Sequence, residues 1–423
     1  MEGQAVQLIG GEKRAIDAGD PLPIARKFKL AGEIAVIDLD AALGQGSNRE
    51  LVEALCREAS CRVGGGIRDV ETAKRWLDAG ARRIILGTAA QPEILSQLPR
   101  ERVIAALDAK DGEVVIEGWR KGTGRGILER IAELREHVSG FLVTFVEREG
   151  RLGGTDLGRV QAIVDAAGSA RVTIAGGVTT AAEIAELDRL GADAQVGMAL
   201  YTGRLSLAEG IAAPLRTDRP DGLWATVICD PHGRALGLAW SNAESLARAV
   251  ESGRGVYWSR SRGGLWMKGE SSGATQELLA IDHDCDRDAL RFTVRQAPPG
   301  FCHLDTTSCW GPLGGIPALA ETLAARAVDA PEGSYTARLL GDAELLRAKL
   351  LEEAGELADA TAPEHVAAEA ADVLYFTMVA LARAGVGMEA VERELDRRAL
   401  GVTRRAGDAK PGAIREKAKG ETP

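Results

Sequence analysis

The chain has few aromatic residues, few histidines and few cysteines, and it distributes them unevenly. Aromatic residues make up 4% of the 423 residues, and only five histidines and six cysteines occur. Four of the cysteines lie between Trp224 and Trp310, whereas the last hundred residues contain neither cysteine nor tryptophan. The length excludes a small disulfide-stapled protein. The uneven distribution indicates separate modules with different chemistry.

The sequence also lacks long apolar runs and an excess of positive charge. No run approaches the ~18–20 apolar residues of a membrane span, and the segment after Met1 does not have the pattern of a signal peptide. We therefore expect a cytoplasmic protein with no membrane partner, whose reduced cysteines serve as metal ligands or catalysts. The 52 basic and 62 acidic residues give a net charge of −10, which disfavours non-specific binding to nucleic acid.

The sequence pattern divides the chain into three modules, so we expect a multidomain protein. Residues 1–216 alternate seven β-branched runs with amphipathic segments, which predicts an α/β fold of the (β/α)₈-barrel type that lacks its first strand. Residues 217–317 contain strand-like runs and one helix, which predicts a small, mostly-β α+β metal domain. Residues 318–423 are rich in Ala, Leu and Glu with a 3.6-residue period, which predicts an all-α domain.

Part of the high glycine content, 51 residues, lies in two segments of the first module that echo each other. Segments 63–89 and 174–200 each contain a strand, a Gly-Gly pair, a helix and a second strand followed by Gly. Backbone N–H groups in such loops bind anions, so the duplication predicts a substrate with a phosphate at each end. The alternative is that the glycines only serve strand–helix turns. The candidate phosphate binders are Gly65, Gly66, Gly87 and Thr88 in one half, and Gly176, Gly177, Gly197 and Met198 in the other.

An acidic run in the second module has the composition of a metal site. Four aspartates alternate along residues 282–288, so on an extended chain they point to one side. Their hard oxygen ligands favour Mg²⁺. The alternative is an acidic surface strand. The four residues are Asp282, Asp284, Asp286 and Asp288.

Three cysteines of the same module have a spacing that suits zinc. Thiolates from Cys285, Cys302 and Cys309, together with a water, would form an open zinc site that lowers the pKa of that water. The alternative is a set of buried reduced cysteines. His303 adjoins Cys302, and we consider it as a general base, as a fourth ligand or as a structural histidine.

A basic stretch precedes both metal motifs. Residues 258–273, WSRSRGGLWMKGESSG, place three cations in a Ser/Gly-rich segment, which suits a phosphate. The alternative is a solvated basic hairpin. The candidate contacts are Arg260, Arg262 and Lys268, with Ser271, Ser272 and Gly273 as further donors.

Together, residues 258–273, the DCDRD motif (284–288) and the CHLDTTSC motif (302–309) resemble phosphoribosyl-AMP cyclohydrolase, an enzyme of histidine biosynthesis. The resemblance covers about residues 220–312 and implies hydrolytic opening of the adenine ring of phosphoribosyl-AMP. It also implies Zn²⁺ at the three cysteines, Mg²⁺ at Asp284, Asp286 and Asp288, and a homodimer whose subunits share zinc ligands. Ser271 stands where the family usually has threonine.

The third module contains two pairs of carboxylates at helical spacing. Glu353 and Glu356 are three residues apart, as are Glu369 and Asp372, so each pair shares one face of its helix. Two such helices would build a Mg²⁺ site with four carboxylates. The alternative is ordinary solvated helix charge, but the second pair lies in the apolar setting AADVLYF, where a lone carboxylate is costly.

This arrangement, together with GSYTARLL (333–340), resembles phosphoribosyl-ATP pyrophosphohydrolase over about residues 318–410. The resemblance implies hydrolysis of phosphoribosyl-ATP to phosphoribosyl-AMP and pyrophosphate, with the four carboxylates as catalytic metal ligands. The first product is the substrate implied for the second module. Phe376 stands where that family commonly has histidine.

The motifs IDLDAALGQGSN, VGGGIRD and GMALY of the first module resemble the isomerase of the same pathway, which acts on the cyclohydrolase product. The resemblance implies that Asp108 is one of two catalytic aspartates and that the other belongs to a strand with no counterpart here. Asp17 and Asp20 lie in a loop-like stretch, and Ala175 replaces a usual serine. We therefore expect a bifunctional hydrolase with a non-catalytic barrel. The alternative is a trifunctional enzyme with a rearranged acid such as Asp38.

Overall fold

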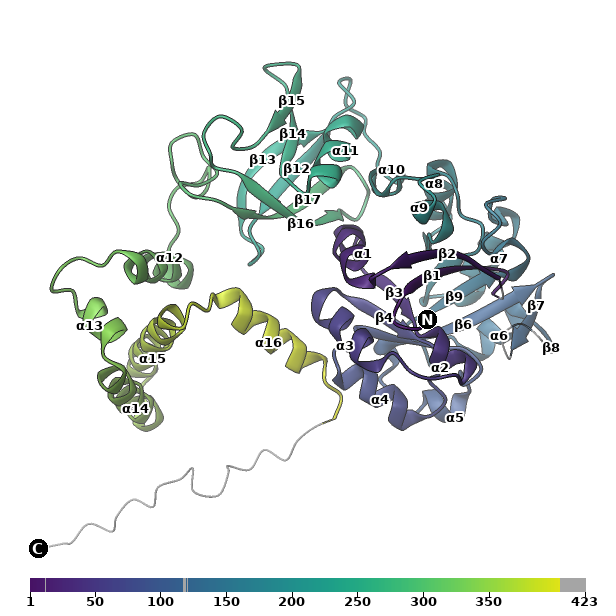
Figure 1. Cartoon of the computed structure of the whole chain (residues 1–423), viewed down its shortest axis with the longest axis horizontal. Coiled ribbons are helices and arrows are strands. Elements are labelled where there is room, and N and C mark those ends of the chain that lie inside the picture. The colour runs from purple at the N-terminus through teal and green to yellow at the C-terminus, as the bar shows by residue number, and fades with distance from the viewer. Residues whose placement is uncertain (12, 117–118, 120, 404–423) are drawn as a thin grey trace, which may run out of the picture.

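The computed structural model describes residues 1–403 except 12, 117–118 and 120. The end of the third predicted module, residues 404–423, therefore lies outside the described residues. Figure 1 shows three regions: a barrel-like region, a central sheet next to it, and a group of helices on the other side of the central sheet.

The first region is a curled parallel sheet that forms an open half-barrel, as the sequence predicts. Its strand order is β11-β10-β9-β6-β5-β4-β3, and within the described residues β11 and β3 are the free edges. The β-branched runs become strands because both faces are covered, by helices outside and by side chains inside. The strands are β3 (Ile34–Ile37), β4 (Cys61–Gly64), β5 (Arg83–Leu86), β6 (Val103–Lys110), β9 (Gly140–Phe145), β10 (Arg171–Ala175) and β11 (Ala192–Ala194).

Helices follow most of these strands and bury their apolar faces on the outside of the sheet. Several begin at a capping residue that the sequence supplies, such as Asp69 before α4 and Thr180 with Glu183 at α8. Two antiparallel hairpins, β1 (Ala5–Ile9) with β2 (Lys13–Gly19), and β7 (Glu113–Ile116) with β8 (Lys121–Gly126), accompany the barrel. The helices are α1 (Pro21–Phe28), η1 (Lys29–Ala31), α2 (Leu39–Leu43), α3 (Arg49–Glu58), α4 (Val70–Asp78), α5 (Pro92–Leu95), η2 (Arg100–Arg102), α6 (Ile127–Leu134), η3 (Val146–Arg148), α7 (Leu157–Ala167), α8 (Ala181–Arg189), α9 (Met198–Tyr201) and α10 (Leu207–Ala212).

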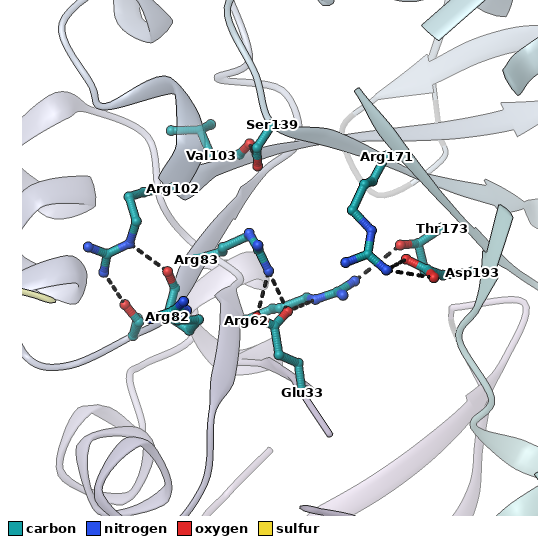
Figure 2. A network of polar contacts seen from close by, with 11 residues as sticks. Glu33, Arg62, Arg82, Arg83, Arg102, Val103, Ser139, Arg171, Thr173 and Asp193 are labelled. Carbon is teal, nitrogen blue, oxygen red and sulfur yellow. Dashed lines mark hydrogen bonds and ion pairs between the residues drawn. The ribbon is translucent and has the colours of Figure 1, made fainter. Parts of the chain in front are cut away.

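Ion pairs occupy the barrel end at which the parallel strands begin (Figure 2). Glu33 accepts hydrogen bonds from Arg62 and Arg83, and Arg62 reaches across to the hydroxyl of Thr173 at 3.1 Å. Burial acts to raise the pKa of Glu33, but the two guanidinium groups outweigh it and lower that pKa. A partly buried ion-pair network of this kind ties β4 to β10 across the barrel and stabilises this end.

The central region is a four-stranded sheet of order β13-β12-β17-β16 plus the hairpin β14–β15. Leu30 of η1 and Leu207 and Ile211 of α10 belong to the same buried cluster as Ile281 and Phe292 of this sheet, so barrel and central sheet share a core that the module boundaries do not reveal. The elements are β12 (Trp224–Cys229), β13 (Ala235–Ser241), α11 (Ala243–Ser252), β14 (Val256–Ser259), β15 (Gly264–Met267), β16 (Gln276–His283) and β17 (Ala289–Gln296).

The third region is all-α, as predicted, and its core is thin. The buried residues are Leu323, Leu339, Leu346, Phe376, Met378 and Val379. Helix α15 is long and apolar enough to cross a membrane by length and composition alone, which is weak support for a span, and 17% of that window is buried. The helices are α12 (Gly315–Val328), α13 (Tyr335–Gly341), α14 (Ala343–Asp359), α15 (Pro363–Arg383) and α16 (Met388–Leu400).

Helix α16 leaves the other helices and runs along the central sheet to the barrel (Figure 1). Its Glu392 lies 2.6 Å from His232 of the central region, and its Glu389 lies 2.9 Å from Arg295. At its end, the carbonyl of Leu400 accepts a hydrogen bond from Arg102 of the barrel, and Asp78 accepts the N–H of Val402. The last helix therefore contacts both other regions.

Candidate active sites

One cavity is lined by all eight phosphate-binding residues that the sequence predicts for the barrel. Gly65 and Gly66 follow β4, Gly87 and Thr88 follow β5, Gly176 and Gly177 follow β10, and Gly197 and Met198 follow the short β11. All eight residues line this cavity, which Asp108 also lines. The two halves of the repeat therefore line one cavity with the loops that follow their strands, which is the end at which barrels of this type bind substrate.

The glycines of this cavity differ in whether the backbone conformation requires glycine. Gly65, Gly66, Gly176 and Gly177 have φ between +69° and +92°, and a Cβ on any of them would collide with backbone or side-chain atoms, so the turns themselves require glycine. Gly87 has ordinary φ and open space around its missing Cβ. Packing therefore does not require glycine at this position, and the absence of a side chain leaves room in the cavity.

Asp108 of β6 and Glu149 are among the carboxylic acids that line the barrel cavity. Burial raises the pKa of Asp108, although hydrogen bonds with Trp119 and Thr144 act to lower it. Burial, and then the charge of Asp108, raise the pKa of Glu149. No sequence motif singles out Glu149, which follows η3 in an irregular segment shortly after the end of β9. Both groups suit proton transfer, because a raised pKa brings a carboxyl closer to neutral pH.

The carboxylate of Asp38, the alternative acid, is occupied by hydrogen bonds from backbone N–H groups. Asp38 caps α2, where its carboxylate accepts hydrogen bonds from the N–H of Ala41 at 3.2 Å and of Asn48 at 2.7 Å. Asp17 lies in β2 and pairs with Arg14, and Asp20 caps α1. These three aspartates therefore have structural partners that account for them.

The acidic run of the central region adopts a turn rather than the extended strand that we expect from the sequence. Strand β16 ends at His283, and Arg287 takes a left-handed conformation with φ of 67°. Oxygen atoms of Asp284, Asp286 and Asp288 nevertheless lie within 4.8 Å of one another. Asp282 stays on the strand, where it pairs with Arg291 at 2.9 Å.

Hydrogen bonding sets the charge of these aspartates unevenly. Burial acts to raise the pKa of Asp284, but hydrogen bonds from the N–H of Ala289 and from its neighbours hold that pKa low. Two effects raise the pKa of Asp288: its side-chain hydrogen bond with Asp284, and then the negative charge of Asp286. The trio therefore crowds negative charge in a way that a divalent cation would relieve.

The predicted zinc ligands separate into a pair and a single residue. Cys302 and Cys309 interact: a backbone hydrogen bond and Cys309 lower the pKa of Cys302, whereas burial and Cys302 raise that of Cys309. Cys285 is exposed and lines a cavity with residues of the barrel. The described chain does not bring the three sulfur atoms together within 4.8 Å. His303 is exposed, with Nδ1 3.8 Å from the sulfur of Cys302.

The predicted phosphate grip is partly assembled. Lys268 follows β15, is buried, and lies 5.5 Å from the centre of the Phe301 ring. Burial lowers its pKa, which the thiols of Cys309 and Cys302 partly offset. Arg260 stacks over Trp240 at 4.6 Å, while Arg262, Ser271, Ser272 and Gly273 are exposed in the adjoining turns. Lys268 is thus the candidate closest to the thiols.

In the helical region, Glu353 and Glu356 of α14 meet Glu369 of α15. Their carboxylate oxygens lie within 4.8 Å of one another, and Lys349 pairs with the buried Glu353 at 2.7 Å. Partial desolvation and the charges of Glu353 and Glu369 raise the pKa of Glu356. Asp372 is exposed and outside this group.

Phe376 has a structural position in the helical region. It is buried, and its ring makes edge contacts with Tyr375 at 5.1 Å and Tyr335 at 6.4 Å. The residue that departs from the family's histidine therefore packs the core of α13 and α15.

Family models match all three regions. A histidine biosynthesis protein model matches residues 1–206, phosphoribosyl-AMP cyclohydrolase matches 237–311, and phosphoribosyl-ATP pyrophosphohydrolase matches 316–399. An imidazole-4-carboxamide isomerase of Methanoregula boonei is 41% identical over 229 residues, which is 50% of this chain and 94% of that protein. The chain is thus similar, in order along its length, to a histidine biosynthesis protein and to two hydrolase families of the same pathway. The chain belongs, through its barrel, to the family of that isomerase.

Fungal histidine-biosynthesis proteins are also similar. A trifunctional protein of Komagataella pastoris is 50% identical over 219 residues, 52% of this chain and 26% of the relative. A bifunctional protein of Schizosaccharomyces pombe is 52% identical over 207 residues, 49% of each chain. The chain thus spans between a quarter and a half of the length of these fungal relatives.

The comparisons contradict our expectation of a non-catalytic barrel. The barrel matches nearly the full length of an isomerase, and several relatives are named trifunctional. That expectation rested on a strand and an aspartate without counterparts in the sequence, whereas the cavity contains Glu149 as a further acid. The trifunctional alternative accounts better for these observations.

Proposed function

We propose that the chain is a trifunctional enzyme: it releases pyrophosphate from phosphoribosyl-ATP, opens the purine ring of phosphoribosyl-AMP, and isomerises the resulting ribotide in the barrel. The observation that carries the proposal is the barrel cavity, because two glycine loop pairs and two carboxylic acids with raised pKa values line it together. The backbone N–H groups of the two glycine loop pairs suit two phosphates, and the two acids suit proton transfer.

In the barrel, Asp108 and Glu149 are the proton carriers of the rearrangement. Because each has a raised pKa, each can hold a proton nearer to neutral pH than a solvated carboxyl can, and the charge of Asp108 adds to the shift at Glu149. The open backbone at Gly87, with Gly176 and Gly177 on the other side, binds the phosphate groups through N–H donors.

In the central region, Cys302 and Cys309 supply two ligands to Zn²⁺, and Cys285 of a second subunit supplies the third in a homodimer. The soft thiols fit zinc, and Lys268 beside them holds the phosphate of the substrate. Bound zinc would supply an acidified water for opening the ring. Asp284, Asp286 and Asp288 fit Mg²⁺ as three hard ligands on one turn.

In the helical region, Glu353, Glu356 and Glu369 bind Mg²⁺, which would neutralise the phosphates of phosphoribosyl-ATP. The mutually repelling carboxylates fit a divalent cation, and the ion pair with Lys349 orients the buried Glu353. The chain acts in the cytoplasm on phosphoribosyl nucleotides, without nucleic acid or membrane partners.

Each step is tested by supplying its own substrate to the purified full chain and separating the products by chromatography. We expect pyrophosphate from phosphoribosyl-ATP, the ring-opened ribotide from phosphoribosyl-AMP, and the isomer from that ribotide. Cys302→Ala should remove bound zinc and block only the second step. Retention of full ring opening by Cys302→Ala would contradict the zinc assignment.

A further inference from the structure

The acidic turn at residues 284–288 lies against the barrel, on the side of helix α8 and of the segment after α10. A cavity between the two regions is lined by Asp188 of α8, by Arg216, and by Cys285, Asp286 and Arg287 of the turn. The strand that leads into the turn packs on the barrel through the shared buried cluster of Leu30, Ile211 and Ile281 described above. The barrel is therefore the fixed surface next to this turn.

Contacts from the barrel converge on Arg287. Oδ1 of Asp188 accepts a hydrogen bond from Nε of Arg287 at 2.9 Å, and its other oxygen pairs with Arg216 at 3.0 Å. The backbone N–H of Arg216 donates to the carbonyl of Arg287 at 2.7 Å. Only 17% of the Asp188 side chain is exposed, against 30% for Arg287, so the solvent screens this pair incompletely.

The residue that precedes the turn, His283, also contacts the barrel through a hydrogen bond. Nε2 of His283 lies 2.7 Å from the carbonyl oxygen of Ile211 in α10. Inside the turn, Arg287 donates to the carbonyl of Asp284 at 3.3 Å, and the carboxylate of Asp284 accepts the N–H of Asp288 at 3.0 Å. Arg287 thus links the barrel to the turn whose three carboxylates crowd together.

The left-handed conformation of Arg287 makes this link necessary. A non-glycine residue in that region of φ costs free energy unless its surroundings hold it there, and Arg287 has φ of 67°. Three neighbouring carboxylates also repel one another before a cation is bound. Both effects act to open the turn, and the barrel contacts oppose both.

We propose that Asp188 and Arg287 form a positioning pair through which the barrel holds Asp284, Asp286 and Asp288 in the arrangement that binds a divalent cation. The inference rests on the function proposed for the central region. It gives the barrel a second role that is independent of its own chemistry.

The test measures cation binding directly, with Mn²⁺ as the probe and electron paramagnetic resonance of the free ion as the readout. A Glu356→Ala background removes a ligand of the helical site, so that the turn is the main site that remains. Replacing Asp188 by Ala should weaken Mn²⁺ binding about fivefold, as expected for a partly buried charged hydrogen bond. Asp188→Glu should restore binding to within about twofold, because it keeps the charge.

The matched control is Asp193→Asn. Asp193 lines the same cavity and pairs with Arg171 at 2.9 Å, but both partners belong to the barrel. This variant should bind Mn²⁺ like the parent. In the chain with an intact helical site, Asp188→Ala should raise the Mg²⁺ concentration needed for ring opening about fivefold, with little change in KM for phosphoribosyl-AMP, and pyrophosphate release should stay normal.

Equal Mn²⁺ affinity of the Glu356→Ala chain with and without Asp188→Ala would overturn the proposal. A loss of Mn²⁺ affinity in Asp193→Asn as large as that in Asp188→Ala would also overturn it. If the parent chain does not open the ring while Asp188→Ala still weakens Mn²⁺ binding, the positioning pair stands and the proposed reaction of the central region falls. The two failures are therefore distinguishable.

Discussion

The barrel and the helical region both raise the pKa of carboxyl groups, but they do so in different ways. Burial is the main cause at Asp108 and Glu149, which lie in a cavity beside an extensive core. At Glu356, partial desolvation combines with the charges of several carboxylates on two helices over a thin core. Enclosed acids suit proton transfer, whereas carboxylates that crowd one another suit a cation. The same residue types therefore indicate two kinds of chemistry.

The substitution with the largest expected effect removes a proton carrier from the barrel. Asp108→Asn keeps the size of the side chain but removes its acid, so isomerisation should fall by about 10²–10⁴-fold. Pyrophosphate release and ring opening should continue in the same sample. Asp165→Asn, on the outer helix α7, is the control. An unchanged rate of isomerisation in Asp108→Asn would show that this buried acid does not transfer a proton in the reaction.

The next effect removes a ligand from the crowded site. Glu356→Ala should lower pyrophosphate release by more than about 100-fold, since even groups one step removed from a metal cost 10–100-fold. Ring opening should be unaffected. Glu364→Gln, in the first turn of α15 and exposed, should retain activity. If both variants lose activity equally, the three-carboxylate cluster is not the site.

The pH dependence of cation binding sharpens the same contrast. Because the pKa of Glu356 is raised, its proton competes with Mg²⁺ at a higher pH than the proton of an isolated glutamate would. Affinity at the helical site should therefore fall about tenfold per pH unit below that pKa. Calorimetric titration of Mg²⁺ in the parent chain and in Glu356→Ala at several pH values measures this affinity by difference. An affinity that stays constant down to the range of ordinary carboxyls would contradict the crowding.

The smallest effect concerns stability at the other end of the barrel. Glu33→Gln leaves Arg62 and Arg83 without their shared carboxylate and should cost about 1–3 kcal/mol in the free energy of barrel unfolding, discounted for partial exposure. Because the pKa of Glu33 is lowered in the fold, its contribution is present above the pKa of the unfolded chain and is lost as the pH falls through the folded pKa.

Urea unfolding of Glu33→Gln and of the exposed control Glu101→Gln, at neutral and acid pH, measures this contribution. The difference between Glu33→Gln and the parent should shrink in acid. A difference that grows as the pH falls would contradict the sign of the shift.

The sequence patterns predicted the strands well because β-branched runs become buried parallel strands. The last run, 194–200, is an exception: β11 spans only Ala192–Ala194, and Met198 already begins helix α9. The acidic turn was misread as extended because a period of two assumes regular backbone, and Arg287 leaves that conformation. The i,i+3 rule places Asp372 on the same helix face as Glu369; the three carboxylates that lie within 4.8 Å of one another are those of Glu353, Glu356 and Glu369, so the part of Asp372 in the site stays a prediction.

Features that depend on distant segments could not be predicted from local patterns. Glu149 follows an irregular segment and reaches Asp108 only because β9 lies beside β6. The contact of Asp188 with Arg287 joins residues almost a hundred positions apart, across what the pattern marks as a linker. Motifs identify which residues carry chemistry, whereas tertiary packing decides which of them meet.

The central claim is that the barrel is catalytic, and one measurement tests it most directly. The purified full chain is given the ring-opened ribotide alone, and the isomer is separated from it by chromatography over time. We predict steady formation of the isomer that Asp108→Asn abolishes. No isomer from a chain that still releases pyrophosphate and opens the purine ring would contradict the account.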